Sequence, residues 1–126
     1  MWISIPAVAV GAAFGALVRW QLGRGLNALF PSMPPGTLLA NLAGAFVAGF
    51  CAVALSREFS PEWRLFAITG FCGGLTTFST FSLEVVGNLQ HGKPALALCT
   101  VAVHVAGSLL MAFAGICAAH FLKSVS

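Results

Sequence analysis

Phenylalanines alternate with hydroxyl side chains in one apolar stretch of the sequence, Phe78-Ser79-Thr80-Phe81-Ser82. Phe78 and Phe81 are three residues apart, so they share one face of a helix, and Ser79 and Ser82 form a neighbouring polar stripe. The edge of an aromatic ring carries partial positive charge, so it can stabilise an anion less tightly than a full charge would. The pattern favours a helix face along which an anion passes, although phenylalanines at this spacing also pack against lipid or a core.

Other polar residues in apolar surroundings extend this chemistry. The amide of Asn41 is a hydrogen-bond donor suited to an anion, and His104 and Ser108 lie on one helix face because they are four residues apart. Each has a structural alternative: an asparagine can bond to a neighbouring helix, a buried histidine is usually hydrogen-bonded, and a serine allows close packing. Arg19 would concentrate anions if it lined an aqueous vestibule. Alternatively, it snorkels towards the interface beside Trp20.

Glycines cluster just before the aromatic stretch, at Gly70, Gly73 and Gly74. Each glycine destabilises a helix by about 1 kcal/mol relative to alanine, so the cluster favours a break near the middle of the helix. Backbone freed at membrane depth needs a partner, and carbonyls around Gly73 and Thr76 would suit a small hard cation such as Na⁺. The alternative is that the glycines only let two helices cross closely, as Gly11, four residues before Gly15, also would.

The composition places these residues in a membrane protein. The chain is 59% hydrophobic and 7% charged, whereas soluble domains are about 25% charged. Four apolar segments, at 3–30, 37–56, 62–89 and 95–122, each approach the ~20 residues that a helix needs to cross a bilayer. We therefore predict an all-α integral membrane protein, with one four-helix transmembrane domain over 1–126. The scattered basic residues do not indicate nucleic-acid binding.

Basic residues are divided equally between the two sides of this predicted bundle. Arg57, Arg64 and Lys123 fall on one side, and Arg19, Arg24 and Lys93 on the other. Because the Lys/Arg imbalance of short loops sets orientation, a chain without one is expected to insert both ways round. Two oppositely inserted copies would form an antiparallel homodimer, equivalent to an inverted repeat. The alternative is that one of these arginines lies deep in the protein and should not be counted.

Four sequence motifs together resemble the Fluc fluoride channels, also called the CrcB family. They are GxxxGxxxR at Gly11, Gly15 and Arg19, followed by Trp20; PPGTLLAN at 34–41; GFCGGLTTFSTFSLE at 70–84; and HVAGS at 104–108. The resemblance covers all four spans, and the third motif is long and unusual. It implies a dual-topology antiparallel homodimer in the bacterial inner membrane. Such a channel passively exports fluoride, is selective over chloride, and so confers fluoride resistance.

The resemblance also assigns residues to roles. It places the pore phenylalanines at Phe78 and Phe81, the pore-mouth asparagine at Asn41, the polar track at Ser79, Thr80 and Ser108, and the vestibule arginine at Arg19. It further implies a central structural Na⁺ held by the backbone carbonyls of Gly73 and Thr76. His104 and Glu84 match the motifs without an assigned role.

Two other classes of function fit the sequence less well. A small dual-topology multidrug or cation transporter needs a carboxylate in its first span, and no Asp or Glu precedes Glu58. An intramembrane enzyme needs a cluster of catalytic groups, but His91, His104 and His120 are too dispersed and no GxSxG motif occurs. We therefore expect a channel and not an enzyme.

Overall fold

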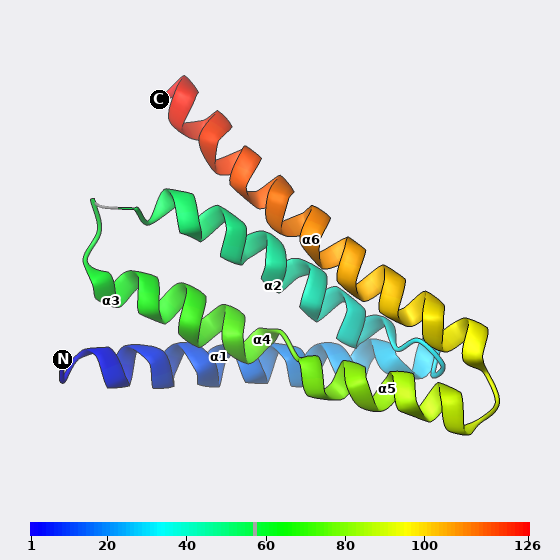
Figure 1. Ribbon diagram of the computed structural model, residues 1–126. Helices are drawn as coiled ribbons and strands as arrows, with labels where there is room; N and C mark the ends of the chain where they lie inside the picture. Colours follow the sequence, from blue (N-terminus) through cyan, green and yellow to red (C-terminus); the bar gives the residue numbers. More distant parts are fainter. Residues whose placement is uncertain (57) are drawn as a thin grey trace.

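The protein is a bundle of long helices (Figure 1). The computed structural model describes residues 1–56 and 58–126, and all regular structure in these residues is helical. The elements are α1 (Ser4–Leu26), the 3₁₀ turn η1 (Asn27–Leu29), α2 (Pro35–Ala54), α3 (Pro61–Arg64), the π-helical segment η2 (Leu65–Cys72), α4 (Gly73–Leu75), α5 (Phe78–Gln90) and α6 (Pro94–Val125). Together α3, η2, α4 and α5 make up the third span.

Four stretches of this chain are long and apolar enough to cross a membrane: Ser4–Leu29, Pro35–Ala54, Pro61–Gln90 and Pro94–Val125. Their outer surfaces are apolar as well, since Leu98, Leu110 and Phe113 on α6 are 70%, 68% and 66% exposed. Such side chains would be poorly placed against water but suit lipid. The prediction of an all-helical membrane protein with four apolar helices is confirmed.

Prolines mark where several helices begin. Pro35, Pro61 and Pro94 each lie in the first turn of their helix. A proline is favourable there because its missing N–H would have no partner within the helix and its fixed φ suits helical geometry. Gly92 has a φ of +69° in the turn before α6, a conformation that glycine adopts without steric strain. The spans are therefore bounded by residues that suit turns.

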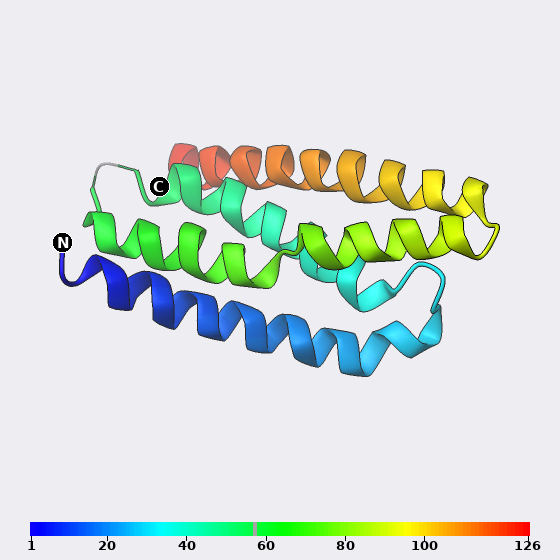
Figure 2. The same cartoon turned by 60° about the horizontal axis from the view of Figure 1, so that its bottom comes forward.

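Small residues let the helices pack backbone to backbone in two pairs, α1 with the first half of the third span and α2 with α6 (Figure 2). A Cβ atom added to Gly15 would overlap the carbonyl oxygen of Phe71, and one added to Gly11 would lie 2.9 Å from the Phe71 nitrogen. In the second pair, a Cβ on Gly49 would overlap the Ala112 carbonyl oxygen. Helix pairs in lipid associate through such close contacts.

The third span departs from helical geometry at two residues, Thr76 and Thr77, which we call the extended link. Their φ/ψ angles are −80°/152° and −146°/117°. The glycines, where we expected the interruption, lie in helical segments instead: Gly73 has a φ/ψ of −63°/−37°, and Gly70 and Gly74 pack against the backbone of α1. The glycines thus allow a close helix crossing, and threonines form the link.

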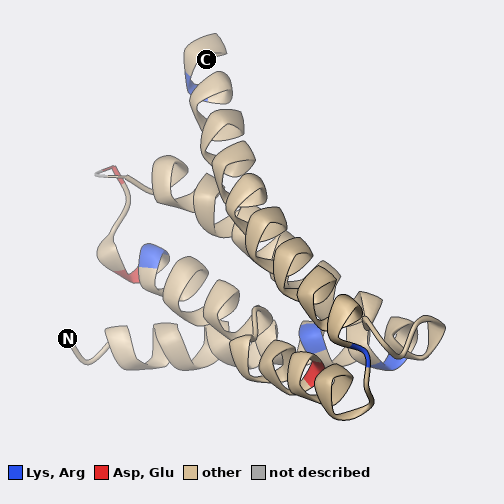
Figure 3. Cartoon of the chain, turned by 45° about the vertical axis from the view of Figure 1, so that its right-hand side comes forward, with Lys and Arg blue, Asp and Glu red and all other residues tan. Residues whose placement is uncertain are grey.

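Charged residues lie mostly towards the two ends of the bundle (Figure 3). The N-terminus, the α2–α3 connection and the C-terminus lie at one end, and the α1–α2 and α5–α6 connections at the other (Figure 1). Arg19 is an exception, because its half-buried side chain reaches the third span, where Nε donates to the Gly74 carbonyl at 3.0 Å. Arg57, one of the three basic residues assigned to one side of the predicted bundle, lies outside the described residues.

Candidate functional site

Two pockets flank the extended link, and Thr77 lines both of them. The first has a volume of about 340 Å³ and is lined by Asn41, Ala45, Thr76, Thr77, Phe78, Phe81, His104, Val105, Ser108 and Leu109. The second, of about 360 Å³, is lined by Arg19, Trp20, Gly23, Arg24, Asn27, Thr37, Thr77 and Thr80. The first pocket therefore combines hydroxyl, amide and aromatic groups, and the second contains two arginines, Arg19 and Arg24.

The side chain of Asn41, on α2, holds the extended link in place. Its Oδ1 accepts a hydrogen bond from the Thr77 N–H at 2.7 Å, and its Nδ2 donates to the Thr77 carbonyl at 3.1 Å. Asn41 thus satisfies both backbone groups of a residue that has left the helix, as burial among apolar helices requires. The asparagine is itself 9% exposed.

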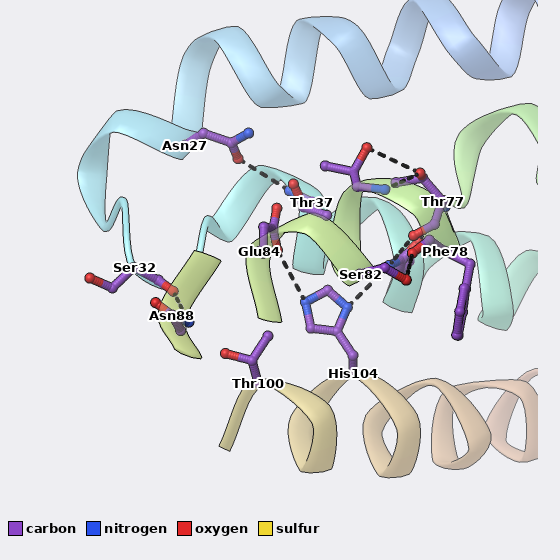
Figure 4. A network of polar contacts seen from close by, with 12 residues as sticks. Asn27, Ser32, Thr37, Thr77, Phe78, Ser82, Glu84, Asn88, Thr100 and His104 are labelled. Carbon is purple, nitrogen blue, oxygen red and sulfur yellow. Dashed lines mark hydrogen bonds and ion pairs between the residues drawn. The ribbon is translucent and has the colours of Figure 1, made fainter. Parts of the chain in front are cut away.

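The imidazole of His104, on α6, continues this network towards α5 (Figure 4). Its Nδ1 lies 3.1 Å from Asn41 Nδ2, and its Nε2 lies 4.0 Å from Glu84 Oε2. The ring also packs on Phe81, with centroids 4.7 Å apart, and Phe81 meets Phe78 edge-on at 5.4 Å. His104 and Phe81 are 4% and 7% exposed, whereas Phe78 is 77% exposed. One aromatic ring is therefore fixed in the core while the other lies on the surface of the protomer.

The hydroxyl of Thr77 caps the N-terminus of α5, the second half of the third span. Its Oγ1 accepts from the Thr80 N–H at 3.1 Å, the usual contact of an N-cap threonine. The same oxygen lies 3.2 Å from the hydroxyls of Thr80 and Ser79. Three hydroxyls therefore meet at the N-terminus of α5, where the helix dipole is positive.

Two carbonyl groups lose their usual helical donors at the link. In a continuous α-helix the N–H of Thr77 would donate to Gly73 and that of Thr80 to Thr76. Here Thr77 donates to Asn41, and Thr80 donates to the Thr77 hydroxyl. Oxygen atoms of this kind suit a hard cation, so the carbonyls of Gly73 and Thr76 fit the expected Na⁺ ligands.

The predicted site residues are distributed around the link. Asn41, Phe78, Phe81, Ser108 and Thr76 line the first pocket, and Arg19 and Thr80 line the second. Ser79 and Gly73 are exposed on the protomer. The sequence prediction did not include Thr77, which lines both pockets. The available signal was a threonine directly before a helix, where its hydroxyl oxygen can accept a hydrogen bond from a backbone N–H of the first turn.

Four apolar helices, with a pocket of hydroxyl, amide and aromatic groups between the second, third and fourth spans, define a small multi-pass membrane protein. Residues 6–116 match the family described as CrcB-like protein, Camphor Resistance (CrcB). The chain belongs to this family.

Relatives with a stated function are similar over nearly their whole length. A protein of Chromobacterium violaceum named fluoride-specific ion channel FluC is 60% identical over 126 residues, which cover 98% of this chain and 99% of the relative. Proteins with the same name from Chromohalobacter salexigens and Nitrosomonas europaea are 55% and 54% identical. These matches cover 99% and 98% of this chain, and 96% and 99% of the relatives. The expected family is confirmed.

Proposed function

We propose that this chain forms a fluoride-selective channel that lets cytoplasmic fluoride leave a bacterial cell passively across the inner membrane, and so confers fluoride resistance. The observation that carries the proposal is the first pocket, which gathers an amide, hydroxyls and two phenylalanines beside the extended link. Among the described residues that line it, none is Lys or Arg. The relatives named as fluoride-specific channels support the choice of ion.

The pocket chemistry suits a small, strongly hydrated anion. Removing water from fluoride is unfavourable, and several modest donors in series offset this without one deep binding site that would stop flux. The ring edges of Phe78 and Phe81 and the hydroxyl of Ser108 are donors of this kind. Arg19 lies across Thr77 in the second pocket, where it can attract anions without holding them at the narrow part of the path. Thr80 and Ser79 continue the polar track on that side.

We further propose that two oppositely oriented copies form an antiparallel homodimer around a structural Na⁺. Gly73 is exposed on the protomer, so a partner could reach its carbonyl. The diversion of the Thr77 and Thr80 N–H groups leaves the Gly73 and Thr76 carbonyls available to a cation. Two copies would supply four such oxygens. The equal division of Lys and Arg between the two sides supports insertion in both orientations.

Fluoride efflux from liposomes that contain the purified protein tests the function. We expect rapid fluoride efflux and little chloride efflux, with the membrane potential clamped so that only the ion differs. Absent fluoride flux, or equal chloride flux, would contradict the proposal. Proton-coupled uptake of an organic cation instead would favour the multidrug transporter.

Separate experiments test the assembly. Reporter fusions at the C-terminus should be found on both sides of the membrane, and a single orientation would refute dual topology. Replacing Na⁺ with a large organic cation during purification should lower the dimer fraction in detergent, whereas an unchanged dimer would count against a structural Na⁺.

A further inference from the structure

The amide of Asn41 has only one orientation that satisfies its neighbours. Its Oδ1 accepts from the Thr77 N–H, and its Nδ2 donates to the Thr77 carbonyl. A flipped amide would place the NH₂ group against an N–H and the oxygen against a carbonyl oxygen, and both contacts would be repulsive. The extended link therefore depends on what keeps Asn41 in this orientation.

His104 is the third partner of this amide. An NH₂ group has two hydrogens, and the second one points to His104 Nδ1 at 3.1 Å. This contact is a hydrogen bond only if Nδ1 is unprotonated, so the neutral imidazole carries its proton on Nε2. Nε2 is buried without a hydrogen-bond partner among the described residues, and so is the atom that it faces, Glu84 Oε2, 4.0 Å away.

We propose that His104 is a positioning residue: by accepting from Asn41 it fixes the amide, and through the amide it fixes the link at Thr77. The same contact makes the link sensitive to acid. A protonated imidazole donates from both nitrogens, so its Nδ1 can no longer accept from Asn41 and instead repels the NH₂ group. Acid therefore releases the group that holds Thr77.

The groups around His104 favour the loss of its contact with Asn41 when the ring is protonated. On α5, Glu84 faces Nε2, and its carboxylate would attract a protonated ring away from Asn41. On α2, Asn41 and Thr37 are neutral side chains. On α1, Arg19 lies across Thr77 in the second pocket. The contact with Phe81 holds the ring from the side and leaves both nitrogens free to exchange partners.

Two variants separate positioning from simple packing. His104→Gln keeps an acceptor oxygen for Asn41 but cannot be protonated, whereas His104→Leu removes the acceptor. This part of the test rests on the proposed fluoride flux, measured in liposomes between about pH 4.5 and 7.5, a range that includes that of an ordinary histidine and extends below it. Protein-free liposomes correct for the leak of undissociated HF.

We expect acid to lower wild-type flux by about threefold to tenfold, the equivalent of one hydrogen bond. The flux of His104→Gln, relative to its own value at the highest pH, should not depend on pH, and His104→Leu should be slow at every pH. A wild-type profile that matches His104→Gln would overturn the proposal.

A second readout does not depend on transport. Nitrogen NMR of ¹⁵N-histidine-labelled protein in detergent reports which imidazole nitrogen carries the proton, and the His104 signal is the one lost in His104→Gln among His91, His104 and His120. We expect an unprotonated Nδ1 at neutral pH, and a mixture of tautomers in Asn41→Ala. A protonated Nδ1 in the wild type would overturn the positioning role. If the tautomer is as expected but no fluoride flux occurs, the proposed function fails and the contact between His104 and Asn41 stands.

Discussion

The two halves of the third span are held by different interactions. Before the extended link, η2 and α4 pack on α1 through backbone contacts at glycines, as where a Cβ on Gly74 would overlap the Ala12 carbonyl oxygen. After the link, α5 is tied to its neighbours by side-chain hydrogen bonds, such as that from Asn88 to the Ser32 carbonyl at 2.9 Å. The first half, held mainly by backbone contacts, is thus a fixed support, and the second presents side chains whose hydrogen-bond partners can exchange.

The comparison predicts a larger effect for changes in the first half. A backbone overlap cannot be relieved by rotating a side chain, whereas one hydrogen bond contributes about 0.5–1.5 kcal/mol net.

The largest effect is expected from Gly15→Ala in α1. The new Cβ would overlap the Phe71 carbonyl oxygen and lie 2.7 Å from the Leu75 nitrogen, so the two helices must separate. We expect a loss of about 3 kcal/mol of stability, the upper end of the usual range for overpacked cores. The fraction of folded protein after heating in detergent, measured by size-exclusion chromatography, checks this.

Gly25→Ala is the matched control, because a Cβ there meets nothing within 4 Å. Both substitutions lie in α1 and gain the same helix propensity, about 1 kcal/mol. Gly25→Ala should therefore be neutral or stabilising. Equal behaviour of the two variants would show that close packing does not hold the first half.

The next effect concerns the hydrogen bonds at the link. Asn41→Ala removes the two hydrogen bonds to the backbone of Thr77, each of which contributes about 0.5–1.5 kcal/mol net to stability. Because the link borders the proposed path, fluoride flux per folded channel should fall at least about tenfold, the equivalent of 1.4 kcal/mol.

Asn88→Ala provides the comparison for this variant. The two asparagines are similarly buried, at 6% and 9% exposed, but Asn88 bonds to Ser32 in the α1–α2 connection, away from the link. The Asn88→Ala variant should be less stable than the wild type, but its fluoride flux per folded channel should be unchanged. An equal loss of flux in both variants would contradict a specific role of Asn41.

Much of this arrangement follows from local patterns in the sequence. Apolar runs of about the required length predicted the four helices, and the Phe78/Phe81 spacing predicted that both rings lie on the same side of α5. The contact between the rings, with centroids 5.4 Å apart, agrees with that spacing. Alternation and length are properties of neighbouring residues, so a single sequence suffices for them.

The position of the link was harder to predict. Glycine propensity pointed to Gly73, but tertiary contacts with α1 keep the glycines helical, and the exit from the helix depends on Asn41, 36 residues from Thr77. The contact between Asn41 and His104 likewise joins residues 63 positions apart. Such long-range hydrogen bonds depend on how helices cross, which local pattern does not specify.

A moderate effect is expected from Phe81→Ile. The substitution keeps an apolar side chain in a buried place, so the loss of stability should stay below about 1.5 kcal/mol. It removes the ring edge, so fluoride flux should fall by about tenfold if that edge stabilises the anion by about 1.4 kcal/mol. The liposome efflux assay measures this.

The control for Phe81 is Phe113→Ile on α6, which replaces a ring that is 66% exposed on the protomer and lines neither pocket. Flux should not change in that variant. Unreduced flux in Phe81→Ile would argue against a direct contact between the ring and the ion, and would leave Phe81 as a packing partner of His104.

The smallest effect is expected at Arg19, where a side chain from α1 contacts the first half of the third span and lines the second pocket. Arg19→Gln removes the charge and should slow fluoride flux by about threefold in low salt, and by less in ~0.1 M inert salt, where the screening length is about 10 Å. Arg19→Lys keeps the charge and should conduct nearly as well as the wild type. If Arg19→Lys and Arg19→Gln instead slow fluoride flux equally at all salt concentrations, the charge of Arg19 does not determine the flux. The bond from Arg19 to the Gly74 carbonyl would then be its contribution, and the residue would belong with the fixed support formed by α1 and not with the ion path.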